Sequence, residues 1–343
     1  MKGWISRLLS RGQDRDPVVG ADASTDPLQP VDEPAPVEMA TEPAPLAAAE
    51  EPAAENARID PLPWLLNSGP LTHTELSAPE AAALAAVDQI RALPIVPDNL
   101  LPRAAALIPQ LIALVRQTDL PVPAIAARVG KDPVLAAELM RLARSPYYRV
   151  QGQVADLEQA ISLIGLQGLQ TVIARVLLKP IYQSAPGPLS GRVSARMWEH
   201  SEALARHTAI LAEPAGQAIF DGYLVGMLHD TGWTVALTVI DRANIALTLP
   251  PSAAFASALE DRVHRLFGHA AQRWHITREF TALAQDARRN GPASDSHPLA
   301  KVLRDAHRRC MAELSACDAG PAALRGYHRP AVARAPRRGH TAM

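Results

Sequence analysis

Apolar residues recur at spacings of three and four along most of the chain between residues 77 and 289, with polar residues between them. This spacing places the apolar side chains on one face of a helix, so it predicts a succession of amphipathic helices. Ser77, Asp132 and Asp156 are suitable N-cap residues at the start of three of these stretches, and Pro133 suits the first helical position. The helices that we expect span residues 77–93, 98–117 with a bend at Pro109, 122–129, 133–145, 156–164, 166–179, 196–211, 220–229 and 298–317.

One segment is apolar at nearly every position and then ends in two polar residues. Residues 220–228 carry large apolar side chains at helical spacing together with Gly222 and Gly226, and His229 and Asp230 follow. The pattern predicts a buried helix, in which the glycines permit close contact with a neighbouring helix. A buried imidazole and carboxylate cost free energy unless they bind each other, a backbone group or a metal ion. His229 and Asp230 are therefore candidates for a functional site.

A further histidine, His200, lies upstream in the helical stretch 196–211. A separate histidine followed by a His-Asp pair is the order found in HD-type metal phosphohydrolases. By this resemblance His200, His229 and Asp230 are candidate ligands of one divalent metal, which would activate a water molecule. The residues also permit a second interpretation, in which His229 bonds the backbone and Asp230 caps the next helix at Thr231. In that case the chain needs no cofactor.

The composition favours helices over sheets. Hydrophobic residues make up 48% of the 343 residues and aromatic residues only 4%, because Ala, Leu and Val dominate. We therefore predict an all-α fold. The net charge of −1 gives no general reason to expect a nucleic acid or a membrane as partner. No apolar run is long enough to predict a transmembrane segment.

The two cysteines, Cys310 and Cys317, are too few for a disulfide framework, which predicts a cytoplasmic location. His307 precedes Cys310 by one helical turn, but two thiols and one imidazole at this spacing match no common zinc motif. We therefore assign no metal site to these residues.

Changes in composition divide the chain into four parts. Residues 1–12 form a short amphipathic segment, which predicts either weak membrane contact through residues 1–11 or a frayed terminus. Residues 13–76 are rich in Pro, Ala and acidic residues, as in a disordered linker, although residues 61–66 offer an apolar knob that could dock back. Residues 77–290 form the all-α domain. Residues 291–343 form a basic C-terminal extension that we expect to be partly disordered.

Six short motifs, in this order, resemble the bacterial HDOD family of HD-related output domains over residues 93–289. They are Leu93-Pro94 with Pro97, Ile125-Ala126 with Asp132-Pro133, Leu139 to Ser145, Ala160 to Gly165, Trp198 to Ser201, and Gly226 to Gly232. The resemblance implies an all-helical HD-like domain in a cytoplasmic bacterial signalling protein. It also implies a regulatory module without hydrolase activity, a pseudoenzyme that interacts with a protein partner or ligand.

The chain departs from the family pattern where metal chemistry would lie. Active HD-type relatives carry a lysine just after the His-Asp turn, where it can stabilise phosphate charge, but this chain has Trp233. His264 resembles a later histidine of the family, yet the histidine pair that should follow has no counterpart near residues 287–288. A metal site built on this pattern would be incomplete.

We therefore predict a non-catalytic signal-transduction protein in which His200, His229 and Asp230 are the remnant of a metal site. The alternative is a metal-dependent phosphohydrolase that acts on a nucleotide or cyclic dinucleotide. That alternative needs further metal ligands, for which the candidates are Asp241, Asp261 and Asp286. Lone aspartates on helices more often cap a helix or face solvent than bind a metal.

Overall fold

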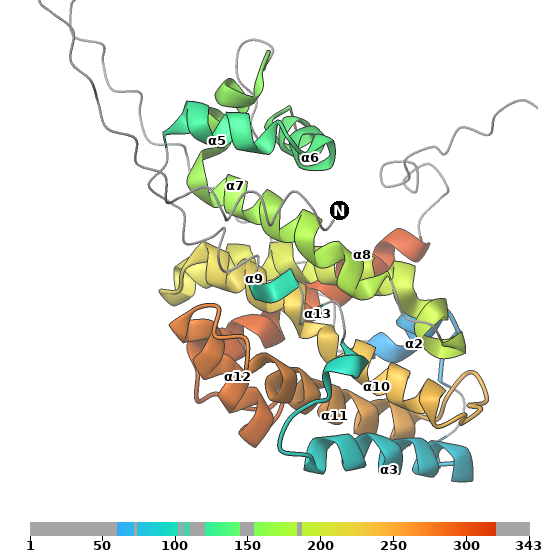
Figure 1. The fold of residues 1–343 in the computed structure, drawn as a ribbon. Coiled ribbons are helices and arrows are strands. Elements are labelled where there is room, and N and C mark those ends of the chain that lie inside the picture. Colours follow the sequence, from blue (N-terminus) through green and yellow to red (C-terminus); the bar gives the residue numbers. More distant parts are fainter. Residues whose placement is uncertain are drawn as a thin grey trace, which may run out of the picture. The chain divides into compact units, whose positions relative to one another are not determined.

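The computed structural model describes residues 60–71, 74–101, 104, 107–109, 121–144, 154–183 and 187–319, all within a compact unit that begins at Ile59. Every regular element among these residues is a helix, which confirms the predicted all-α fold (Figure 1). The predictions made for residues 1–59, for the helix beyond Pro109 and for residues 320–343 lie outside the described residues.

The helices that the sequence predicts occur in the predicted order, and the helices over residues 61–66, 253–271 and 278–290 are additional to the predicted stretches. The amino-terminal ones are α2 (Pro61–Leu66), α3 (Ala78–Ala92), the 3-10 helix η1 (Asp98–Leu100), α5 (Val122–Val129) and α6 (Pro133–Ala143). They are followed by α7 (Leu157–Tyr182), α8 (Pro188–Ala212), the 3-10 helix η3 (Glu213–Ala215), α9 (Ile219–His229), α10 (Thr231–Arg242), α11 (Ala253–Ala271), α12 (Arg278–Asn290) and α13 (Pro298–Ala319).

The three predicted N-caps begin helices as expected. Ser77 Oγ accepts a hydrogen bond from the backbone N–H of Glu80, and the Glu80 carboxylate accepts one from the backbone N–H of Ser77 at 2.8 Å. This reciprocal pair is a capping box, which satisfies two backbone donors at the start of α3. Asp132 and Asp156 accept bonds at 2.8 Å from backbone N–H groups in the first turns of α6 and α7.

Helix α7 is kinked at Gly165, where the sequence predicts that one helix ends and another begins. Gly165 has φ of 66°, a backbone conformation that favours glycine, and two helical stretches meet there. The second stretch runs to Tyr182, beyond its predicted end near Lys179. Within the part of the chain that the structure describes, α7 alone has the length and hydropathy of a membrane span. Core helices share these properties, and 50% of its apolar window is buried.

Helices α5 and α6 pack against α7 (Figure 1). Arg175 on α7 connects this group to α8, because its guanidinium lies 2.8 Å from Glu138 on α6 and also forms an ion pair with Glu202 on α8. Burial alone would lower the pKa of Arg175, but the two carboxylates raise it. The cation therefore holds three helices together.

Helices α8 and α9 pack closely, and α10, α11 and α13 contact one or both of them. The two glycines of α9 permit this approach, as predicted. A Cβ atom at Gly226 would lie 2.6 Å from the Cα atom of Ala205 on α8, and one at Gly222 would lie 2.6 Å from the backbone oxygen of Thr208. Only glycine fits at such distances, so the spacing of α8 and α9 depends on these two residues.

Two helices outside the predicted domain of residues 77–290 belong to the same core. Helix α2 lies within the predicted linker, yet Leu62, Leu65 and Leu66 are fully buried, so the linker prediction is wrong for this stretch. Burial of these side chains offsets the entropy lost on ordering, and the apolar knob docks. Helix α13 confirms the helix predicted over residues 298–317. It packs against α8 with Cys310 and Leu314 buried.

The two leucines of α6 that the sequence places in the core are buried to different extents in the structure. The sequence predicts that both Leu139 and Leu142 are buried, but Leu139 is fully buried and Leu142 is only partly so. We expect Leu139→Ala to lower the free energy of unfolding by about 2–5 kcal/mol, because it leaves a cavity between α6 and α7. Leu142→Ala, the matched control, should cost less than about 2 kcal/mol. Urea unfolding measures both, and equal losses would contradict this assignment.

Candidate functional site

Two polar side chains meet in the core between α8 and the junction of α9 with α10. His200 Nδ1 lies 2.6 Å from Oδ2 of Asp230, and both side chains are fully buried. Ser201 Oγ lies 2.7 Å from the same carboxylate oxygen. We refer to His200, His229 and Asp230 as the HD centre. The structure thus brings together all three residues that the sequence singles out.

Asp230 reaches this position because α9 ends immediately before it. It is the C-cap residue of α9, and α10 begins at Thr231. Its side chain makes no capping bond to α10, so the alternative prediction that Asp230 caps the next helix is wrong. The carboxylate accepts a hydrogen bond from His200 instead, because a bond to an ionised donor is stronger than one to a backbone amide.

The charges of this pair stabilise each other. Burial alone would lower the pKa of His200 and raise that of Asp230, because an apolar surrounding disfavours charge. The contact between the two groups outweighs burial, so the pKa of His200 lies well above its usual range and the pKa of Asp230 lies well below. An imidazolium–carboxylate pair therefore occupies the centre near neutral pH.

His229 bonds to a histidine of α11. Its Nε2 atom lies 3.2 Å from Nδ1 of His264, and the two ring centroids are 5.3 Å apart. Burial, followed by the proximity of His229, lowers the pKa of His264 well below its usual range, so His264 is neutral. One interpretation of the sequence gave His229 a backbone partner, but in the structure its Nε2 atom has a side-chain partner instead.

A fourth histidine joins the cluster from α13. The His307 ring lies edge-on to His200, with centroids 5.2 Å apart and an interplanar angle of 87°, and its centroid is 6.3 Å from that of His229. Sequence reasoning noted His307 only beside Cys310. The useful signal was the helical spacing that places both residues on the apolar face of α13, although it does not reveal which helix they meet.

The HD centre does not fit a metal ion in this arrangement. His200 Nδ1 is bonded to Asp230, and His229 Nε2 is bonded to His264, so two candidate ligand atoms already have partners. Among the residues that the structure describes, no group of three or more His, Cys, Asp or Glu side chains is arranged to hold a metal. Three other atoms of the centre are buried without a hydrogen bond, namely His200 Nε2, His229 Nδ1 and Asp230 Oδ1, although the last two lie 3.5 Å apart, within ion-pair distance.

The three further candidate aspartates bind elsewhere. Asp241 accepts hydrogen bonds from two backbone N–H groups at the start of α8, both at 2.9 Å. Asp261 forms an ion pair with Arg265 at 3.0 Å, and Asp286 accepts a bond from Ser294 Oγ at 2.9 Å. These aspartates therefore cap helices or pair with neighbours, as lone aspartates commonly do, and they add no ligand to the HD centre.

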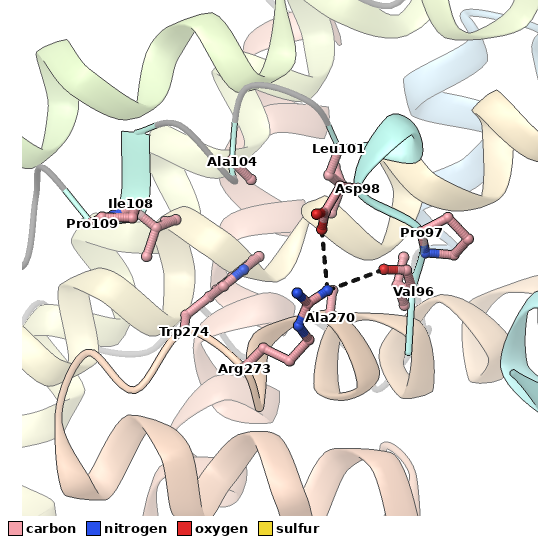
Figure 2. A pocket seen from close by; sticks show the side chains of 10 residues that line it. All are labelled: Val96, Pro97, Asp98, Leu101, Ala104, Ile108, Pro109, Ala270, Arg273 and Trp274. Carbon is pink, nitrogen blue, oxygen red and sulfur yellow. Dashed lines mark hydrogen bonds and ion pairs between the residues drawn. The ribbon is translucent and has the colours of Figure 1, made fainter. Parts of the chain in front are cut away.

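A cavity of about 280 Å³ lies away from the HD centre. Figure 2 shows it between the segment 96–109 and the end of α11, with Trp274 on one side and Arg273 paired to Asp98 at 3.1 Å. Its lining includes the buried apolar residues Ile108 and Ala270. The described residues around this cavity include none of the HD centre, so it gives no route to the buried pair.

A family model for the HDOD domain matches residues 101–287, which is more than half of the chain. The chain belongs to the HDOD domain family. Over 206 residues it is 25% identical to an uncharacterised protein of Treponema pallidum (strain Nichols), a match that covers 57% of this chain and 37% of that protein. The chain thus spans only about a third of the length of this relative.

Solved structures with a similar fold include an HDOD domain protein of unknown function from Geobacter sulfurreducens, with 20% identity, a TM-score of 0.43 and coverage of 67% of this chain and 78% of that one. A protein of Shewanella amazonensis SB2B, provisionally described as a metal-dependent phosphohydrolase, has 16% identity, a TM-score of 0.47 and coverage of 67% and 82%.

Two helices that contact the HD centre of this HDOD domain lie outside the matched region. His307 comes from α13, which begins eleven residues after the match ends at residue 287. The Trp64 ring of α2 lies 6.3 Å from the His200 ring, and α2 precedes the match. The surroundings of the centre therefore include segments that the family model does not cover.

Proposed function

We propose that this HDOD domain is a non-catalytic regulatory module that binds a protein partner in a signalling pathway. The supporting observation is the contact of 2.6 Å between His200 and Asp230, in which two candidate metal ligands are bonded to each other in a fully buried site. Hydrolytic metal sites need ligands with free lone pairs and an open position for water or substrate. In this arrangement two of the candidate ligand atoms are bonded to other side chains, and no group of three His, Cys, Asp or Glu ligands converges among the described residues.

The HD centre serves, in this proposal, to hold helices in register. The carboxylate of Asp230 joins the α9–α10 junction to α8 through both His200 and Ser201. Trp233 supports this role, because it is fully buried in the core where an active relative would carry a cation. A rigid helical body of this kind can present a surface to a partner without taking part in a reaction.

One observation favours a second candidate function, a metal-dependent phosphohydrolase that acts on a nucleotide or cyclic dinucleotide. Three atoms of the HD centre are buried without hydrogen-bond partners, which is uncommon in folded proteins. If the His200–Asp230 contact opened, His200 Nδ1 and Asp230 Oδ2 would add to these atoms as ligands for a divalent metal, which would supply an activated water molecule.

A metal and activity assay separates the two functions. We expect the purified full-length protein to hold less than about one-tenth equivalent of transition metal by elemental analysis. We also expect no turnover of nucleotides or cyclic dinucleotides with added manganese, iron or magnesium. His229→Ala tests the HD centre, and Asp261→Ala, which removes an aspartate paired with Arg265 away from the centre, is the matched control. Turnover that His229→Ala abolishes and Asp261→Ala retains would overturn the non-catalytic proposal.

We place the protein in the bacterial cytoplasm, with a protein rather than a nucleic acid as its partner, since the net charge of −1 favours no polyanion. Residues 1–11 could add a weak membrane contact. Pull-down of the full chain from its host, followed by mass spectrometry, identifies candidate partners.

A further inference from the structure

Helix α2 lies against His200 of the HD centre. The Trp64 ring lies 6.3 Å from the His200 ring, and the guanidinium of Arg196 stacks over the same indole at 4.8 Å. Leu62, Leu65 and Leu66 of α2 are fully buried, and α2 contacts both α8 and α11. A helix of only six residues thus buries five of them against the neighbouring helices.

Two arginines of α8 hold α2 by its backbone. Arg192 Nε donates to the carbonyl oxygen of Leu66 at 2.7 Å, and Arg196 Nη1 donates to that of Trp64 at 2.9 Å. Both acceptors are main-chain atoms, which any peptide in the same conformation presents. These contacts therefore recognise the shape of a short helix, while the buried apolar side chains supply the sequence preference.

Two buried polar atoms where α2 meets the HD centre lack hydrogen-bond partners. Trp64 Nε1 and His200 Nε2 are both buried without a hydrogen-bond partner. Permanently buried polar atoms are nearly always paired, so two unpaired nitrogens on facing side chains weaken the contact. Departure of α2 would give both atoms access to water. The docked state of α2 is therefore less stable than its apolar burial alone indicates.

We infer that α2 occupies a peptide-docking groove in cis, and that the partner of this HDOD domain is a segment of the same chemistry, a short helix with a Trp-Leu-Leu anchor, which displaces α2. The inference rests on the proposed partner-binding function and adds its site. Docked α2 is the evidence for what fits there: one large aromatic ring beside His200, fully buried leucines, and backbone carbonyls bonded to Arg192 and Arg196. Exchange of the segments would expose the HD centre transiently.

The test compares the full-length parent with the double variant Trp64→Ala/Leu65→Ala, in which α2 no longer fills the groove. The probe is a dye-labelled peptide of residues 60–68, and fluorescence anisotropy measures its binding. We expect the double variant to bind the peptide at least about tenfold more tightly than the parent, because α2 competes in the parent at the high effective concentration of a tethered ligand. A peptide with alanine in place of Trp64 should not bind.

Two control variants make the outcome specific. In the double variant, adding Arg196→Ala should weaken peptide binding about tenfold, because it removes the stacking and the bond to the Trp64 carbonyl. Adding Arg206→Ala, an arginine of the same helix that bonds Glu313 instead, should leave binding unchanged. Equal peptide affinity for parent and double variant, or no binding to either, would overturn the inference.

Thiol labelling of the buried Cys310 shows whether the core of the double variant stays folded. Cys310 is fully buried with its Sγ atom 3.8 Å from the His200 carbonyl oxygen, whereas Cys317 is exposed. In a folded double variant a thiol reagent should label Cys317 and spare Cys310. If both react equally, α2 is an integral part of the core rather than a displaceable ligand, and the inference fails. Metal-dependent turnover in the separate activity assay would overturn the non-catalytic proposal without affecting any of these binding results.

Discussion

Asp230→Asn is expected to lower the free energy of unfolding by about 3–5 kcal/mol near pH 6, because it leaves the buried His200 without its counter-charge. The asparagine keeps the shape of the side chain, so the loss of free energy of unfolding measures the effect of removing the negative charge. The matched control is Asp261→Asn, whose partner Arg265 holds it at the surface with side-chain exposures of 42% and 23%. That substitution should cost less than about 1 kcal/mol. Urea unfolding measures both variants.

The same pair predicts a pH dependence with a definite sign. The lowered pKa of Asp230 contributes stability above its unfolded pKa of about 4, and this contribution is lost as the pH falls. The raised pKa of His200 contributes stability below its unfolded pKa of about 6.5, and this contribution is lost as the pH rises. The advantage of the parent over Asp230→Asn should therefore be largest between these values and shrink at pH 8.5. A constant difference across that range would argue against an ion pair.

Gly232→Ala is expected to destabilise the protein by at least about 3 kcal/mol, because the added methyl group has no room. A Cβ atom at this position of α10 would lie 2.1 Å from the backbone oxygen of Val263 on α11. Backbone atoms cannot rotate away as a side chain can, so the two helices would have to separate.

Gly130→Ala is the control for this substitution. Gly130 has φ of −61°, and a Cβ atom there would lie 3.2 Å from the nearest atom, the oxygen of Ala126. The change should alter stability by less than about 1 kcal/mol. Thermal unfolding compares the two variants, and a melting temperature for Gly232→Ala within experimental error of the parent would contradict the close packing of α10 on α11.

Local features of the chain were predictable because their causes lie within a few residues. Ser77, Asp132 and Asp156 cap helices through bonds to the next turn, and Gly165 interrupts α7 through its own backbone conformation. The pairing of His200 with the His-Asp doublet was also predictable, but only through the resemblance to a family, since spacing alone favoured a capping role for Asp230.

Features that depend on distant partners escaped sequence reasoning. The apolar face of α13 indicated burial without naming α8 as its neighbour, so His307 was not placed beside His200. Leu142 fits the same helical stripe as Leu139, yet only the latter is fully covered. Composition assigned α2 to a linker, because its five buried residues are too few to change the character of a long Pro- and Ala-rich stretch.

The position of α2 and α13 determines which residues a fragment or chimera containing this domain must include. A fragment cut at residues 101 and 287 would keep every residue of the HD centre and yet lose the two helices that shield it from solvent. Leucines that are buried in the full chain would form an exposed hydrophobic patch, which favours aggregation. Water and salt would weaken the exposed His200–Asp230 ion pair. The unit to transfer therefore runs from α2 to α13. Chimeras joined at the ends of the family match would expose apolar core residues to solvent.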